Sequence, residues 1–148
     1  MADFTGRLSD IPVSGQVYPR TVRNLGSVLS LTAQGAGTVL SSTARGREIN
    51  LSSRGVRVTV VIANKAGTID AVFTIRRYDK ASGTFVNMLA SASLTADGTT
   101  TLTVHPDLTA AANSIAKDFI GEEFDVQLVS GAGSTPAFDC TVGVELLP

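Results

Sequence analysis

The feature that most constrains this chain is an alternation of apolar and polar residues in its middle and at its end. In the middle, four branched apolar residues fall at every second position: Val56, Val58, Val60 and Ile62. A second such run closes the chain: Phe138, Cys140, Val142, Val144 and Leu146. A period of two residues is typical of a β-strand with one buried face. The sequence therefore predicts sheets that pack their apolar sides into a core.

The composition agrees with a packed fold of one domain. The chain has 148 residues, of which 43% are hydrophobic and only 17% are charged, which is the opposite of the balance in disordered chains. Tryptophan is absent and tyrosine occurs twice, so Val, Ile, Leu and Ala must build most of the core. Small and β-branched residues fit pleated strands and tight turns better than helices.

Turn-forming residues divide the chain into about eight strands. The expected strands cover residues 37–43, 49–51, 56–63, 69–76, 85–93, 99–105, 124–129 and 138–146. A hairpin is expected at residues 78–85, and Asp97-Gly98 predicts a second hairpin between the strands on either side of it. This pattern predicts an antiparallel β-sandwich, either immunoglobulin-like or a jelly roll, whose strand order stays open.

Residues 107–120 are the one helix candidate. Asp107 can cap a helix, and four apolar residues follow with helical spacing: Leu108, Ala111, Ala112 and Ile115. We expect either a short helix or a partly helical crossover loop.

The first part of the chain follows neither period. Residues 1–36 combine prolines and glycines with scattered apolar residues, and a short strand at residues 27–33 is compatible with them. We predict an extended arm over residues 1–36 and a β-sandwich domain over residues 37–148. The arm either lies on a neighbouring subunit or folds back on its own domain. The candidate partner-binding residues are Phe4, Leu8, Ile11, Val13, Tyr18, Arg20 and Arg23.

Charge is balanced overall but uneven along the chain. The net charge is −1, which gives no reason to expect nucleic acid as a partner. The charged residues among positions 45–80 are mostly basic, and those among positions 97–148 are mostly acidic. Two interpretations stay open: strands from the two halves interleave and pair their charges locally, or the surface is polarised and orients the subunit beside its neighbours.

The sequence offers little for catalysis or metal binding, and we predict neither an enzyme nor a cofactor. His105 is the sole histidine and stands next to Pro106, with no Ser, Cys or carboxylate at a recognisable spacing. Glu122, Glu123 and Asp125 suit either a calcium ion or, more commonly, exposed carboxylates at the start of a strand. Cys140 lies among apolar alternate positions, so we expect a buried thiol.

The chain shows no sign of export or membrane insertion. Its first residues lack the charged and apolar regions of a signal peptide, and no apolar run approaches the roughly 20 residues of a membrane helix. We expect a protein made in a cytoplasm, with no membrane partner.

Residues 54–145 resemble a family of small virion proteins of tailed phages and prophages. The resemblance rests on the order of several short stretches: Arg54-Gly55-Val56, Tyr78-Asp79-Lys80-Ala81-Ser82-Gly83, Leu89-Ala90-Ser91-Ala92, Gly98-Thr99-Thr100, His105-Pro106, Leu108-Thr109-Ala110-Ala111-Ala112-Asn113 and Phe124-Asp125-Val126. It implies a structural protein of the particle that decorates the capsid or forms part of the neck or tail. The first 45 residues do not match this pattern, so the resemblance gives neither the docking site nor the position on the particle.

These observations lead to one functional hypothesis with two competitors. We expect a virion protein that decorates or stabilises the capsid by docking on the major capsid protein, as a homo-oligomer with a trimer favoured. The first competitor is a neck, tail or host-attachment component. The second is a glycan-binding module, which would need exposed aromatic side chains that this composition hardly supplies.

Overall fold

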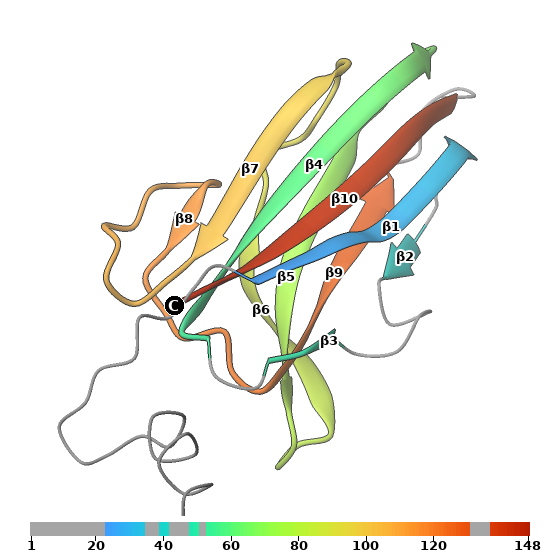
Figure 1. Ribbon diagram of the computed structural model, residues 1–148. Coiled ribbons are helices and arrows are strands. Elements are labelled where there is room, and N and C mark those ends of the chain that lie inside the picture. Colours follow the sequence, from blue (N-terminus) through green and yellow to red (C-terminus); the bar gives the residue numbers. More distant parts are fainter. Residues whose placement is uncertain (1–22, 35–38, 42–47, 51–52, 131–136) are drawn as a thin grey trace, which may run out of the picture.

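The computed structural model of the chain consists of two β-sheets that face each other (Figure 1). It describes residues 23–34, 39–41, 48–50, 53–130 and 137–148. The strands are β1 (Arg23–Gln34), β2 (Val39–Ser41), β3 (Glu48–Ile49), β4 (Gly55–Ala66), β5 (Ala71–Asp79), β6 (Thr84–Ala90), β7 (Gly98–Val104), β8 (Ile115–Ala116), β9 (Glu123–Ser130) and β10 (Ala137–Leu147).

The strand order defines a β4 sheet and a β5 sheet. The β4 sheet has the order β1-β10-β4-β7-β8, and the β5 sheet has the order β2-β9-β5-β6, with β3 also pairing with β9. All pairs are antiparallel except β7 with β8. The predicted β-sandwich is therefore confirmed.

The core lies between the two sheets and is built from the alternate positions that the sequence singled out. Val58 pairs with Val144 and Val60 with Val142 across β4 and β10, which places all four side chains on the same inner face. The β5 sheet contributes residues such as Phe73, which is fully buried. Full burial of a valine or phenylalanine side chain contributes roughly 1.5–3 kcal/mol, so the alternation itself drives the two sheets together.

The two predicted hairpins have different outcomes. The first is confirmed: β5 pairs with β6, and Gly83 in the connection has a φ of +70°. The second is wrong, because β6 belongs to the β5 sheet whereas β7 pairs with β4 in the other sheet. Asp97-Gly98 thus ends a connection that crosses between the sheets. A turn signal gives the place where the chain reverses, but not which strands pair.

The helix expected at residues 107–120 is wrong, and so is the helical part of the alternative: the segment is a crossover loop without a helix. It contains turns and β8, which pairs with β7. Leu108 and the two alanines 111 and 112 are exposed, so the spacing that suggested a helix buries no apolar face here. Asn113 has a φ of +57°, a left-handed backbone conformation that interrupts any helix.

Part of the predicted arm belongs to a sheet. β1 pairs along β10 from Arg23 opposite Leu146 to Gln34 opposite Phe138, and it contains the short strand expected at residues 27–33. Residues 1–22 lie outside the described residues, so the division of the chain into an arm and a domain stays a prediction. The described residues include no helix that is long and apolar enough to cross a membrane.

Candidate functional site

Most of the predicted partner-binding residues fall outside the described part of the chain. These are Phe4, Leu8, Ile11, Val13, Tyr18 and Arg20. Arg23 begins β1, and its backbone lies opposite Leu146 at the end of β10. Their role in binding stays a prediction, and the site must be sought on the described surface.

His105 is held in a structural arrangement at the end of β7. Its Nδ1 accepts a hydrogen bond from the backbone N–H of Asp107 at 3.2 Å, so Nε2 carries the proton and donates to the carbonyl oxygen of Pro148 at 2.8 Å. Gly55 lies against it, because a Cβ there would come within 2.5 Å of the His105 ring and 2.4 Å of the Val104 carbonyl oxygen. Both ring nitrogens are therefore engaged: Nε2 joins the end of β7 to Pro148, and Nδ1 holds the backbone that follows β7.

The thiol of Cys140, which is the other side chain with potential reactivity, is also enclosed. Cys140 is buried on the inner face of β10, as the alternation predicted. Burial, assisted by the negative charge of Asp139, raises the pKa of its thiol to about 11. A protonated, enclosed thiol is a poor nucleophile. Among the described residues, no three His, Cys, Asp or Glu side chains gather in a way that suits a metal ion.

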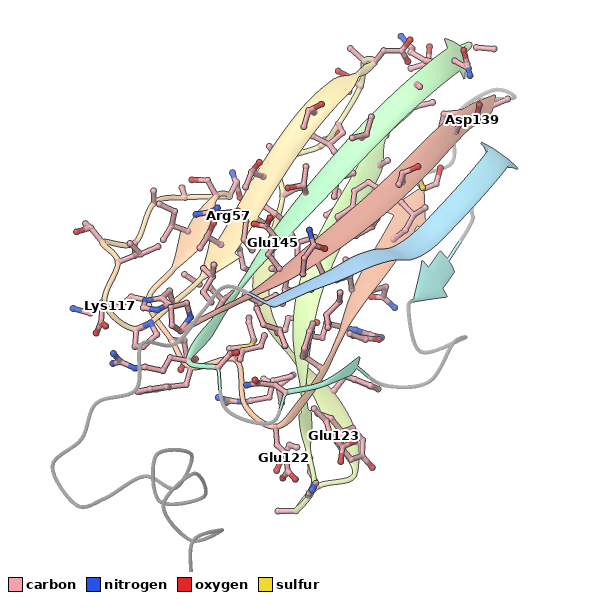
Figure 2. All side chains as sticks on the ribbon, in the orientation of Figure 1. Arg57, Lys117, Glu122, Glu123, Asp139 and Glu145 are labelled. Atoms are coloured by element: carbon pink, nitrogen blue, oxygen red, sulfur yellow. The ribbon has the colours of Figure 1, made fainter. Side chains whose placement is uncertain are left out.

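Charges from the basic and acidic parts of the sequence pair with each other. Among the described residues, six ion pairs join them: Arg54–Asp107, Arg57–Glu145, Arg76–Asp125, Arg77–Asp118, Lys80–Glu122 and Lys80–Glu123. Figure 2 shows Arg57 beside Glu145 on the outer side of the β4 sheet, where their charged atoms are 3.4 Å apart. The described residues thus support the interpretation of interleaved strands with local pairing.

The pair of Arg76 and Asp125 is the most enclosed of these. The Asp125 side chain is fully buried, and it accepts hydrogen bonds from Arg76 Nε at 2.9 Å and from Nη2 at 2.5 Å. The guanidinium carbon of Arg76 also lies 4.6 Å from the centre of the Phe85 ring, which in turn contacts Tyr78 edge to face at 5.2 Å. This stack joins β9, β5 and β6 on the outer side of the β5 sheet.

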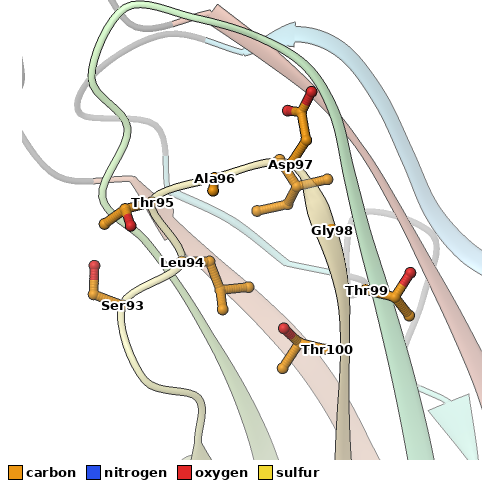
Figure 3. A pocket seen from close by; sticks show the side chains of 9 residues that line it. Ser93, Leu94, Thr95, Ala96, Asp97, Gly98, Thr99 and Thr100 are labelled. Atoms are coloured by element: carbon orange, nitrogen blue, oxygen red, sulfur yellow. The ribbon is translucent and has the colours of Figure 1, made fainter.

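The hollows of the described surface include the following two. The first, about 260 Å³, lies where the chain crosses from β6 to β7, and Figure 3 shows the side chains from Ser93 to Thr100 around it. Asp97 is engaged there with the backbone N–H of Lys65 at 3.0 Å. The second hollow, about 500 Å³, is shallower and more open. It lies between Met88 and Leu89 of β6 and the crossover segment at residues 110–118.

The second hollow runs beside an exposed strand edge. β6 is the last strand of the β5 sheet and, among the described strands, pairs only with β5. Its Val86 side chain is 42% exposed, although valine ordinarily favours the interior. Phe119, at the end of the crossover segment, is 54% exposed, and the Arg54 guanidinium lies 5.6 Å from its ring centre. We therefore take the edge of β6 with the adjoining hollow as the candidate functional site.

The sequence shows the uncharged run that forms this edge strand, but not that the strand lies at an edge. Residues 84–90 read Thr-Phe-Val-Asn-Met-Leu-Ala, a run without charge or proline. Such a run suits a central strand as well as an edge strand, and only the pairing of the strands shows which one it is.

The comparisons with known proteins add little to this geometry. The chain matches no protein-family model, and no curated protein matches it. Among solved structures, a chain from the structure of infectious bursal disease virus Gx strain is similar, with 13% sequence identity and a TM-score of 0.43. The similarity covers 92% of this chain and 38% of that chain, so this chain spans well under half of its length. A likeness at this TM-score carries no argument about function.

Proposed function

We propose that this chain is a non-catalytic structural protein of a tailed-phage particle, which decorates or stabilises the capsid by docking on the major capsid protein. The observation that carries the proposal is the uncharged, exposed edge of β6 with Val86, beside an open hollow that has both apolar and polar side chains in its lining. Exposed edges with adjoining pockets are surfaces on which proteins add a strand from a partner. The resemblance of residues 54–145 to small virion proteins supports the particle as the place of action.

The surface chemistry is consistent with binding rather than turnover. The charged groups of Arg76, Lys80 and Arg54 are directed at acidic partners on neighbouring segments and not into the hollows. Such pairs hold strands in register. The hollow beside β6 is lined by Met88, Leu89 and several alanines together with the polar residues Asn113, Lys117 and Asp118. This lining favours contact with another protein surface.

A shell presents many copies of the same binding site, so the affinity at each site can be modest. When many identical sites are presented together, a modest affinity for each copy gives firm attachment of the whole layer. We propose that the chain acts as a homo-oligomer on the particle and that the predicted arm adds contact area there. An arm that orders only on its partner contributes buried area at a cost in conformational entropy.

A neck, tail or host-attachment component is the second candidate, since it needs the same fold and the same kind of surface. It differs in copy number: a decorating protein is present in proportion to the shell protein, whereas a neck or tail component is present in few copies. Counting copies in purified particles therefore separates the two.

The direct experiment mixes the purified full chain with mature, undecorated shells and measures bound protein after sedimentation. We expect saturable binding in a fixed ratio to the shell protein. The arm variant Ile11→Asp is expected to bind less, because a buried charge opposes docking, whereas Val61→Asp on the outer side of the β4 sheet serves as the matched control. Absence of saturable binding by the unmodified chain rejects the capsid-docking proposal.

A further inference from the structure

The sheet edges differ in how well they are protected against pairing with another strand. β8 has two residues and β2 has three, so both are too short to serve as templates. β1 is long, but its register with β10 shifts at three places, and such irregularities interrupt an edge. β6 has seven residues without charge or proline, and its single register shift leaves residues 84–87 regular, so among the described edges it is the least protected.

The first part of β6 is a regular template. Its register with β5 is unbroken from Thr84 opposite Asp79 to Asn87 opposite Arg76, and the single shift comes after that point. The side chains of Thr84, Val86 and Asn87 are exposed. Because β6 is the last strand of its sheet, the backbone groups on its outer side face away from β5 and can bond to an added strand.

We propose that this edge pairs antiparallel with the β6 strand of a second copy of the chain, about a two-fold axis through Val86. A two-fold axis brings identical residues together, so any charge near the axis would face its own copy and oppose pairing. A different partner could match a charge on β6 with an opposite one. The absence of charge along all seven residues is therefore the property that self-pairing requires.

The surroundings of β6 fit this arrangement. The nearest charged residue in the hairpin turn is Lys80, whose Nζ is 2.8 Å from Glu122 and 3.4 Å from Glu123. Its positive charge is thus balanced within its own subunit. On the outer side, Phe85 is already fixed between Arg76 and Tyr78, so little side-chain freedom is lost when a second strand arrives.

The proposed register makes definite contacts. Val86 lies opposite Val86 of the second copy and Phe85 lies opposite Asn87, all within the regular part of β6. The two β5 sheets then form one continuous sheet. This pair replaces the trimer favoured from the sequence. It occupies the edge of β6, so contact with the shell falls to the adjoining hollow and the predicted arm, and two joined copies present two of each. The test of the pairing needs only the purified chain.

The experiment measures the molar mass of the full chain by light scattering over a range of concentrations. Three valines on strands have nearly equal exposure: Val86 at 42%, Val61 at 40% and Val129 at 38%. We expect a dimer that Val86→Lys weakens by about ten-fold or more in dissociation constant, because two lysines then face each other. Val61→Lys and Val129→Lys are expected to leave the dimer unchanged. A monomeric wild type, or equal effects of the three variants, overturns the proposal.

A second variant tests the register without adding charge. Facing residues of an antiparallel pair have Cα atoms about 4.5–5.5 Å apart, which is within the range of a disulfide. Val86→Cys is therefore expected to cross-link two copies under mild oxidation, whereas Val61→Cys is not. The native thiol of Cys140 is buried and does not compete. Failure of Val86→Cys to cross-link also overturns the proposal.

The outcome is separable from that of the proposed function. A dimer that does not bind shells supports pairing through the edge of β6 and rejects capsid docking. A monomer whose Val86→Lys variant loses shell binding rejects self-pairing and assigns the same edge to the shell protein.

Discussion

The buried ion pair of Arg76 and Asp125, on the outer side of the β5 sheet, allows a specific prediction about the free energy of unfolding. The substitution Arg76→Met removes a guanidinium but keeps an unbranched side chain of similar reach. Asp125, directly opposite on β9, is fully buried and then has a carboxylate without its cation. Removing one partner of a buried pair costs about 3–5 kcal/mol. Since domains are stable by about 5–15 kcal/mol, this single change threatens folding.

Replacing the acidic partner instead, in Asp125→Leu, is predicted to lower the free energy of unfolding by less. In Asp125→Leu the remaining charge belongs to Arg76, whose side chain is 16% exposed and long enough to turn its charged end toward water. We expect a loss of about 1–3 kcal/mol. The double variant Arg76→Met with Asp125→Leu replaces the pair by two apolar side chains, which is often nearly neutral. It should therefore be more stable than Arg76→Met alone.

The assay is urea unfolding followed by circular dichroism in the far ultraviolet, because the chain has no tryptophan to report by fluorescence. The four proteins form a double-mutant cycle that isolates the coupling between the two side chains. If Arg76→Met costs less than about 1 kcal/mol, or if the double variant loses the sum of the single losses, the carboxylate is not held by this pair and the reasoning fails.

Three further predictions concern single sites. Gly55→Ala should destabilise the fold by about 1–3 kcal/mol in urea unfolding, because the new Cβ meets the Val104 carbonyl oxygen at 2.4 Å. Gly143→Ala, with its nearest neighbour at 3.8 Å, should be close to neutral. Asn50→Ala removes three hydrogen bonds between a buried side chain and the backbone, so we expect a loss of about 1–3 kcal/mol in the same assay. Cys140 should not react with a thiol reagent at pH 8 until the chain is unfolded. Burial raises its pKa from 9.0 to about 11, so its stabilising contribution is complete below about pH 9 and is lost as the pH rises through about 11; rapid native labelling would contradict this.

The sequence predicted those parts of the fold where alternation is regular. The buried positions of β4 and β10 follow directly from the runs around Val58 and Val142. β1 was recognised only in part, because register shifts such as the one between Asn24 and Gly26 break its period of two. The second hairpin failed because Asp97-Gly98 gives a local turn, whereas pairing with β4 is a long-range choice.

The candidate site was less predictable than the fold. The uncharged run of β6 is visible in the sequence, but its position at an edge depends on β9 and β5 pairing beside it. The ion pairs depend equally on contacts between distant segments, as for Arg76 and Asp125. The predicted arm residues, from Phe4 to Arg20, lie outside the described part of the chain.

The measurement that bears most directly on the proposed role is quantitative mass spectrometry of virus-like particles purified from the source of this sequence. The account predicts that the chain remains with the particles through purification, in a fixed ratio to the major capsid protein. A small, constant number of copies would favour the neck or tail instead. Complete absence of the chain from intact particles would contradict the account.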